Sequence, residues 1–314
     1  MENEFVLIID FGSQVTQLIA RRLRELKVYC EIHPFNKVND EFLKKINPKA
    51  IILSGGPASV LNKRAPKPPS NSYDLEVPIL GICYGQQIMM QMLGGSVISE
   101  SGTSEFGKSF VKLNNKSKNI KLLEGLFLKE GKEEVWMSHG DHVATIPENF
   151  EVYGVSENAP FAIIGNEKKH FYGVQFHPEV FHTLNGKVLI KNFLKLSNFS
   201  FNWSMQSYLQ QSVEEIKMKV GNNKVICALS GGVDSSVTAI LINKAIGNQL
   251  TCIYVNNGLM RKNESKEVMK LYREHYKLNL IEANENNLFL SNLKGIKDPE
   301  KKRIIIGKLF IQVF

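Results

Sequence analysis

Short apolar runs alternate with amphipathic segments along the first third of the chain. The runs are typical of buried strands, whereas the segments between them carry apolar residues at helical spacing. The predicted strands are Phe5–Asp10, Val28–Ile32, Ala50–Leu53 and Pro78–Leu80. The predicted helices are Thr16–Leu26, Asp40–Ile46 with Asp40 as its N-cap, and Gln86–Leu93. This alternation predicts a parallel sheet that is covered by helices on both faces.

The pattern changes between Glu105 and Gln175. Short alternating runs such as Phe110–Leu113 and Glu134–Met137 predict antiparallel strands that are added to the same sheet. A predicted helix over Gly186–Leu196 closes this unit.

A second alternation of helices and strands begins after a polar and aromatic joint at residues 198–202. Its predicted elements are helix Ser204–Val220, strand Val225–Leu229, loop Ser230–Ser235, helix Ser236–Ala245, strand Thr251–Val255 and helix Glu264–His275. We therefore expect an α/β protein with two α/β domains, residues 4–199 and 200–314. The first domain is expected to have a mixed, largely parallel sheet, and the second a parallel sheet.

Composition is that of an ordinary globular protein and restricts the possible partners. The chain has 314 residues, of which 43% are hydrophobic and 22% charged, and a formal net charge of +8. Its four cysteines include no C-x-x-C pair, which disfavours a disulfide framework or a zinc site and favours a cytoplasmic location. No apolar run is long enough to span a membrane, and the basic stretch 297–308 lacks interleaved aromatic residues. We therefore expect neither a membrane nor a nucleic-acid partner.

A cysteine flanked by glycines, Cys83 between Gly81 and Gly85, lies between a predicted strand and a predicted helix. The small neighbours permit the sharp turn that such a G-x-C-x-G stretch requires. This turn would place the sulfur at a helix N-terminus, where the helix dipole favours a thiolate. A single cysteine in an apolar segment is more often a small buried hydrophobe. A base elsewhere in the chain is needed to decide between these interpretations.

A candidate base follows the predicted strand Tyr172–Phe176. His177 and Glu179 are two residues apart, so in an extended chain they face the same side, and Pro178 stiffens the link between them. Glu179 can then orient the imidazole while His177 exchanges a proton with Cys83. The H-x-E spacing is a weak signal alone, but combined with G-x-C-x-G it indicates nucleophilic cysteine chemistry.

These residues resemble the class I glutamine amidotransferases, and the resemblance covers residues 4–199. It implies a catalytic triad of Cys83, His177 and Glu179 that releases ammonia from glutamine. It also implies an oxyanion hole from the backbone N–H groups of Gly56 and Tyr84, since a glycine leaves room for the developing oxyanion. The positions implied to bind glutamine are Gln87, Ser138, Gly140 and Asp141. A solvated helix position is an equally good interpretation of Gln87 from its residue type.

A second motif, Val225–Ser236, consists of a strand, a loop of glycine and serine, and the start of a helix. Backbone N–H groups in such a loop, ahead of a helix N-terminus, form a cradle for an anion. The lysine of the usual P-loop is absent. A plain tight turn is the alternative, but two glycines, three serines and one acid in seven positions disfavour it. Asp234 offers a hard oxygen suited to Mg²⁺. The cradle residues are Ser230, Gly231, Gly232, Val233, Asp234, Ser235 and Ser236.

This loop resembles the pyrophosphate loop of the ATP pyrophosphatases, which have an adenine nucleotide α-hydrolase-like domain and leave AMP on a substrate oxygen. An amidotransferase followed by this loop resembles the GMP synthetase family. Further stretches share that resemblance, namely Thr16–Arg22, Trp136–Asp141, Asn257–Arg261 and Asp298–Arg303. The resemblance implies amination of xanthosine monophosphate to GMP with glutamine, ATP and Mg²⁺, no tightly bound organic cofactor, and a homodimer. Asn256 departs from the family pattern, which has Asp at this position.

The last residues, Gly307–Phe314, have the pattern of an apolar helix without a C-cap. The resemblance implies that the nucleotide domain continues beyond Phe314 and is followed by a dimerisation domain. We therefore expect glutaminase chemistry to be complete in this chain and GMP formation to be incomplete.

Three alternatives stay open from the sequence. Another amidotransferase, for example one serving carbamoyl phosphate or anthranilate synthesis, would explain residues 4–199 but not the Ser230–Ser236 loop. A tRNA-modifying protein could use that loop, would bind RNA in a salt-sensitive way, and would leave Cys83 without a purpose. An inert binding or regulatory relative is disfavoured by the presence of Cys83, His177 and Glu179 together.

Overall fold

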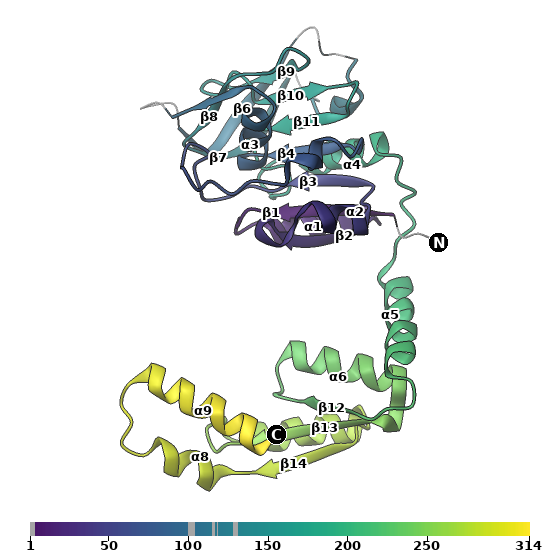
Figure 1. Cartoon of the computed structure of the whole chain (residues 1–314), viewed down its shortest axis with the longest axis vertical. Coiled ribbons are helices and arrows are strands. Elements are labelled where there is room, and N and C mark those ends of the chain that lie inside the picture. The colour runs from purple at the N-terminus through teal and green to yellow at the C-terminus, as the bar shows by residue number, and fades with distance from the viewer. Residues whose placement is uncertain (1–3, 100–103, 115–116, 118, 128–130) are drawn as a thin grey trace. The chain divides into compact units, whose positions relative to one another are not determined.

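The computed structural model describes residues 4–99, 104–114, 117, 119–127 and 131–314. The chain divides into two compact units, the first ending at Ser204 and the second beginning at Met205 (Figure 1). Each unit has its own sheet and its own hydrophobic core. Both units are α/β, which confirms the predicted fold class.

The first unit is built around a nine-stranded mixed sheet. Its strands are β1 (Phe5–Asp10), β2 (Tyr29–Pro34), β3 (Ala50–Leu53), β4 (Ile79–Ile82), β6 (Glu105–Leu113), β7 (Lys132–His139), β9 (Glu151–Val155), β10 (Ile163–Asn166) and β11 (Phe171–Val174). They lie in the order β2-β1-β3-β4-β11-β10-β9-β6-β7. The first five pair in parallel and the other four join through antiparallel pairs, as the change of pattern after Glu105 predicts. A separate antiparallel pair is formed by β5 (Ser96–Ile98) and β8 (His142–Thr145).

Helices cover both faces of this sheet. They are α1 (Thr16–Glu25), α2 (Asp40–Ile46), α3 (Tyr84–Met92) and α4 (Gly186–Leu196). Successive residues of β1 point to opposite faces: Val6 and Ile8 belong to the core with α1 and α4, whereas Leu7 and Ile9 belong to the core with α2 and α3. All four side chains are fully buried, which is why β1 is a continuous apolar run rather than an alternating one.

The N-terminus of α2 differs from the prediction by one residue. The N-cap is Asn39, not Asp40, because the Asn39 side chain accepts a hydrogen bond from the backbone N–H of Phe42 at 2.8 Å. Asp40 lies instead in the first helical turn, where its charge is favourable toward the helix dipole. Both residue types cap helices well, so the sequence alone does not separate them.

The second unit contains a parallel sheet of three strands, β12 (Val225–Ala228), β13 (Leu250–Asn256) and β14 (Leu280–Asn284), in that order. Its helices are α5 (Met205–Val220), α6 (Val233–Ile246), α7 (Glu264–Lys270), α8 (Asn286–Leu293) and α9 (Pro299–Val313). Ala239 of α6 and Met269 of α7 pack in one hydrophobic cluster, and Phe289 of α8 and Leu309 of α9 in another. Within the described part of the chain, none of the helices has the length and apolar character needed to cross a bilayer.

The capping arrangement of α2 predicts a difference between two neighbouring substitutions. Asn39→Ala removes the acceptor for the Phe42 N–H and should lower the free energy of unfolding by about 1 kcal/mol. Asp40→Ala removes no cap and should lower it by only a few tenths, on the order of 0.3 kcal/mol. Urea unfolding of both variants measures this difference. A larger loss for Asp40→Ala than for Asn39→Ala would contradict the assigned cap.

Candidate active site

Cys83 is the residue between β4 and α3, and its backbone is strained. Its φ of +52° and ψ of −108° lie in a region that residues with a side chain rarely adopt. The flanking glycines permit this turn, because a Cβ on Gly85 would overlap the Leu53 carbonyl oxygen and one on Gly81 would lie 2.7 Å from the Gln86 nitrogen. The backbone N–H of Cys83 donates to the Val174 carbonyl at 2.7 Å. The sulfur is thereby held at the N-terminus of α3, as the motif predicts.

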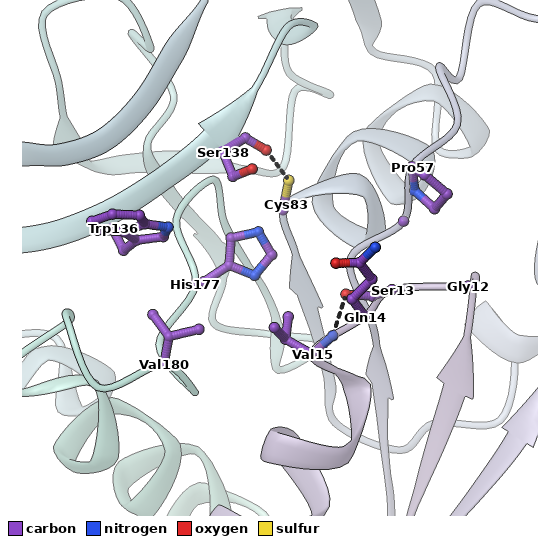
Figure 2. Close-up of a pocket in the computed structure, with 11 residues that line it drawn as sticks. Gly12, Ser13, Gln14, Val15, Pro57, Cys83, Trp136, Ser138, His177 and Val180 are labelled. Atoms are coloured by element: carbon purple, nitrogen blue, oxygen red, sulfur yellow. Dashed lines mark hydrogen bonds between the residues drawn. The ribbon is translucent and has the colours of Figure 1, made fainter.

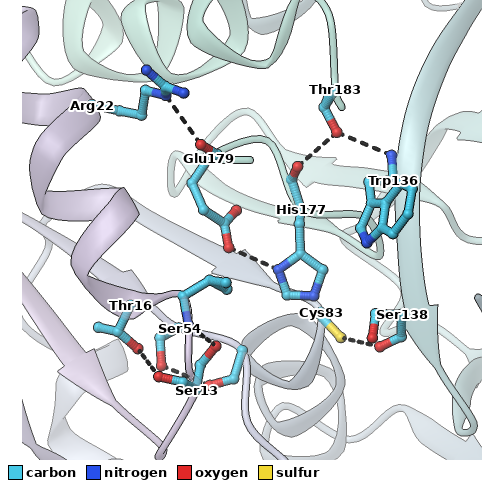
Figure 3. A network of polar contacts seen from close by, with 12 residues as sticks. Ser13, Thr16, Arg22, Ser54, Cys83, Trp136, Ser138, His177, Glu179 and Thr183 are labelled. Atoms are coloured by element: carbon cyan, nitrogen blue, oxygen red, sulfur yellow. Dashed lines mark hydrogen bonds and ion pairs between the residues drawn. The ribbon is translucent and has the colours of Figure 1, made fainter. Parts of the chain in front are cut away.

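His177 and Glu179 follow β11, the strand that pairs with β4. The two side chains are buried and joined by a bond of 2.7 Å between His177 Nδ1 and Glu179 Oε1. Burial opposes the charged imidazole, but the hydrogen bonds and negative charges of the Cys83 sulfur and the Glu179 carboxylate outweigh it and raise the pKa of His177 well above its ordinary value of 6.5. Figure 3 shows the His177 ring between the Glu179 carboxylate and the Cys83 sulfur. The three residues predicted as a triad are therefore brought together.

Three further residues hold this arrangement in place (Figure 3); the sequence analysis includes two of them only within longer stretches and does not name Thr183. Thr183 Oγ1 donates to the His177 backbone carbonyl at 2.7 Å and accepts from the backbone N–H of Trp136 at 3.0 Å. Arg22 Nε of α1 donates to the Glu179 carbonyl at 3.0 Å. These bonds fix the backbone on both sides of the imidazole, which fixes the direction in which the ring points.

Cys83 contributes to two adjoining cavities. One has a volume of about 250 Å³, and its wall includes Cys83 and His177 side by side, with Gln14 and Trp136 (Figure 2). The other has a volume of about 320 Å³ and contains every position predicted for the oxyanion hole and for glutamine. The predicted site residues that line this cavity are Gly56, Cys83, Tyr84, Gln87, Ser138, Gly140 and Asp141.

The shape of the second cavity depends on Gly56 and on Gln87. A Cβ on Gly56 would lie 2.9 Å from the Phe11 carbonyl oxygen, so a larger residue would displace the backbone there. Gln87 is only 4% exposed, so the alternative of a solvated helix position is wrong. Its Nε2 donates to the Asp141 carbonyl at 2.7 Å and thereby holds the predicted substrate loop.

A buried carboxylate, that of Glu105, also supports this loop. Glu105 Oε2 is 3.2 Å from His139 Nε2 and accepts from Ser156 Oγ at 2.7 Å, while its Oε1 accepts from Ser109 Oγ at 2.9 Å. Burial alone would raise the pKa of Glu105, but these hydrogen bonds lower it below its ordinary value. His139 is therefore fixed between Ser138 and Gly140, the loop positions predicted to bind glutamine.

The second predicted motif is partly helical rather than a loop. The structure begins α6 at Val233, three residues before the predicted start at Ser236, because Gly232 already serves as the N-cap. Asp234, Ser235 and Ser236 therefore lie in the first helical turn.

Hydrogen bonds of serine hydroxyl groups connect residues within the loop Ser230–Ser236. Ser230 Oγ is 3.0 Å from Ser235 Oγ, and the Gly232 N–H donates to Ser230 Oγ at 3.3 Å. Ser236 Oγ contacts the hydroxyl of Tyr272. The sequence analysis did not identify Tyr272 as a neighbour of this loop. Gly231 has a φ of +84°, where glycine is favoured, and a Cβ there would lie 2.9 Å from Val268. The loop is thus supported by α7 and by the π-helix Leu271–His275 that follows it.

An apolar cavity of about 470 Å³ adjoins this loop. It is bordered by Ser230 and by residues at the carboxyl ends of β12 and β13, with α9 on another side. Its residues are Ala228, Leu229, Ser230, Ile253, Tyr254, Val255, Asn257, Met260, Phe310, Ile311 and Phe314. Ligands of parallel α/β sheets bind at this edge.

In the portion of the chain that the structure describes, no group of three or more His, Cys, Asp or Glu side chains is arranged to hold a metal ion. Asp234 stands alone in the first turn of α6, which is compatible with Mg²⁺ held mainly by phosphate oxygens. Asn256, which departs from the family pattern, uses its Oδ1 to accept from the Gly258 N–H at 3.3 Å, so it closes a local turn.

Each of the two units matches a known protein family. The sequence profile of the class I glutamine amidotransferases matches residues 7–196, and that of the NAD synthase family matches residues 204–301. The chain is 60% identical over 313 residues to a glutamine-hydrolysing GMP synthase of Dinoroseobacter shibae and 56% identical over 313 residues to one of Cereibacter sphaeroides. Both alignments include 100% of this chain, which spans 60% of the length of these relatives.

A solved structure from Thermoplasma acidophilum, described as that of a GMP synthase component, is also similar. It has a TM-score of 0.50 and 25% sequence identity, and the match covers 66% of this chain and 98% of that one.

The raised pKa of His177 predicts a pH-dependent effect of Glu179→Gln. Because the folded-state pKa lies above the unfolded value, the stabilisation is fully present below about pH 6.5 and is lost as the pH rises through the folded-state pKa. Glu179→Gln should therefore lower the free energy of unfolding by about 3 kcal/mol in mild acid and by less at alkaline pH. Urea unfolding across this range, with the exposed Glu157→Gln as control, checks it. A loss that does not change with pH would contradict the assignment.

Proposed function

Because the chain belongs to the class I glutamine amidotransferase family, we propose that its first unit hydrolyses glutamine to glutamate and ammonia with Cys83 as nucleophile. The observation that carries this proposal is the His177–Glu179 pair beside a cysteine on a strained strand–helix turn. Cys83 borders both cavities, the one that His177 also lines and the one lined by the positions implied to bind glutamine.

The reaction starts from the ion pair in which the proton of Cys83 resides on His177, whose raised pKa favours the imidazolium. The thiolate attacks the side-chain amide carbon of glutamine, and the backbone N–H groups of Gly56 and Tyr84 hold the negative oxygen of the tetrahedral intermediate. His177 then gives its proton to the departing nitrogen, and ammonia leaves. Water attacks the resulting thioester, with His177 as base, and glutamate is released. The Glu179 carboxylate accepts from His177 Nδ1 and stabilises the imidazolium.

Substrate placement follows from the same cavity. The loop Ser138–Asp141 would bind the amino-acid end of glutamine, and Gln87 would contact the substrate while it holds the Asp141 carbonyl. Effective attack requires the amide carbon to lie about 3–3.5 Å from the sulfur, and rigid support of the loop favours such a pose. The bonds of Glu105 to His139 supply that support.

Cys83→Ala should abolish glutamine hydrolysis, because water alone then has to attack the amide. We expect the rate of glutamate release to fall by at least about 1000-fold. A coupled glutamate assay on the purified chain measures it. Cys227→Ala is the matched control, since this cysteine lies in the second unit and outside the site. Glutamate release that survives Cys83→Ala, at a level equal to that of the control, would refute the nucleophile.

We further propose that the second unit binds ATP and that the ammonia is used to convert xanthosine monophosphate to GMP. The similarity to GMP synthases along the whole chain supports this, as does the match of residues 204–301 to the NAD synthase family. ATP would place AMP on the oxygen of the substrate with loss of pyrophosphate, and ammonia would then displace AMP. Another amidotransferase would not account for the Ser230–Ser236 arrangement.

The geometry of this unit suits such a nucleotide. The N-terminus of α6, with the hydroxyls of Ser230 and Ser235, would receive the phosphates. The apolar cavity that borders Ser230 would accept the adenine ring. Mg²⁺ would neutralise phosphate charge when bound, and Asp234 would hold it together with phosphate oxygens.

Asp234→Asn should weaken the binding of ATP in the presence of Mg²⁺ by roughly tenfold, since it removes one charged ligand. Isothermal titration calorimetry with the whole chain measures this change. Asp74→Asn, an exposed carboxylate in the first unit, is the matched control and should bind as the unmodified chain does. Equal affinity of the Asp234→Asn variant and the control would exclude the proposed metal ligand.

A further inference from the structure

A buried glutamine beside Cys83 has no part in the steps above. Gln175 is only 1% exposed and follows β11 directly. Ile82 of β4 pairs with Val174 of β11, so the next residues along these two strands, Cys83 and Gln175, are neighbours. Gln175 Nε2 donates to Cys83 Sγ at 3.7 Å, a contact distance that suits the large sulfur atom. The nucleophile therefore has a fixed amide donor in addition to His177.

The orientation of the Gln175 amide follows from a chain of two hydrogen bonds. The Asp141 carbonyl only accepts, so Gln87 must turn its NH₂ group toward it, at 2.7 Å. The same Gln87 Nε2 lies 3.3 Å from Gln175 Oε1. Gln175 therefore presents its oxygen to Gln87 and its NH₂ group to the sulfur.

A second contact of the Cys83 sulfur, with the Ser138 carbonyl, favours the protonated thiol rather than the thiolate. Cys83 Sγ donates to the Ser138 carbonyl at 3.5 Å, and such an acceptor stabilises the thiol. An N–H donor stabilises the thiolate, because hydrogen bonds to a charged group are stronger than those between neutral groups. When the proton leaves, the bond to Ser138 is lost and the bond from Gln175 is strengthened.

We propose that Gln175 is a further catalytic residue, whose side-chain N–H stabilises the Cys83 thiolate and whose orientation is set by Gln87. In the step concerned, the S–H bond of Cys83 breaks, the proton goes to His177, and the electron pair stays on sulfur. Gln175 donates to that electron pair, while Gln87 connects it to the substrate loop at Asp141. This inference rests on the proposed glutamine hydrolysis and names a residue within the same site.

The test measures the ionisation of Cys83 without using catalysis. The whole chain is treated with iodoacetamide at a series of pH values, and the modification rate of the peptide that contains Cys83 is measured by mass spectrometry. Gln175→Leu keeps the approximate volume and removes the donor, so the midpoint of the rate profile should rise by about one pH unit. Gln175→Glu places a carboxylate beside the sulfur and should raise the midpoint further.

Gln86→Leu provides the matched control. Gln86 is equally buried and lies on the same helix as Gln87, but its Nε2 donates to the Phe161 carbonyl at 2.7 Å. In Gln86→Leu, the midpoint of the pH profile for Cys83 modification should stay at the value of the unmodified chain. An unchanged midpoint in Gln175→Leu, or an equal rise in Gln86→Leu, would overturn the proposal.

Glutamate release by the unmodified chain is measured in parallel. If it is absent while the midpoint still moves in the predicted order, the proposed hydrolysis fails and the contact of Gln175 with the thiolate stands. If glutamate is released and the midpoint does not move, the hydrolysis stands and the role of Gln175 fails.

Discussion

The parallel pairing of β4 with β11 is the interaction on which the site depends. Carboxyl ends of neighbouring parallel strands meet at one edge of a sheet, so the residues that follow the two strands are brought together. Ile82 pairs with Val174, and the Cys83 N–H continues the ladder to the Val174 carbonyl at 2.7 Å. Cys83 and Gln175, 92 positions apart in the sequence, are neighbours for this reason. The distance between nucleophile and base is thus determined by backbone hydrogen bonds rather than by flexible side chains.

The site also balances burial against charge. Glu179 is fully buried and His177 is 7% exposed, so each charge would be costly without the other. Their bond of 2.7 Å compensates for this cost and keeps the imidazole protonated to a pH above its ordinary range. The His177 ring lies next to the Cys83 sulfur, so the positive charge that Glu179 stabilises on this ring also favours a thiolate on Cys83.

Much of this arrangement could be predicted from the sequence, because the signals are local. Apolar runs identify the strands that are buried on both faces, and the glycines around Cys83 identify the strained turn. The predicted helix starts were less accurate, since Asn39 caps α2 in place of Asp40 and α6 begins at Val233. Several residue types suit an N-cap, and only the hydrogen bonds of the folded chain distinguish them.

The supporting residues were harder to predict, because their contacts join distant parts of the chain. Arg22 reaches the Glu179 carbonyl across 157 positions, and nothing around it in the sequence indicates this bond. Gln175 could have been predicted as a site residue, because it precedes His177 by two residues and therefore faces the same side of an extended chain. What the sequence does not give is the direction of its amide, which depends on Gln87 and the Asp141 carbonyl.

The most direct test of the central claim is covalent trapping with a chloroketone analogue of glutamine, followed by peptide mapping. The account predicts a single adduct on Cys83 and loss of glutamate release in proportion to labelling. An adduct on another residue that abolishes glutamate release, or full labelling of Cys83 with glutamate release intact, would contradict it.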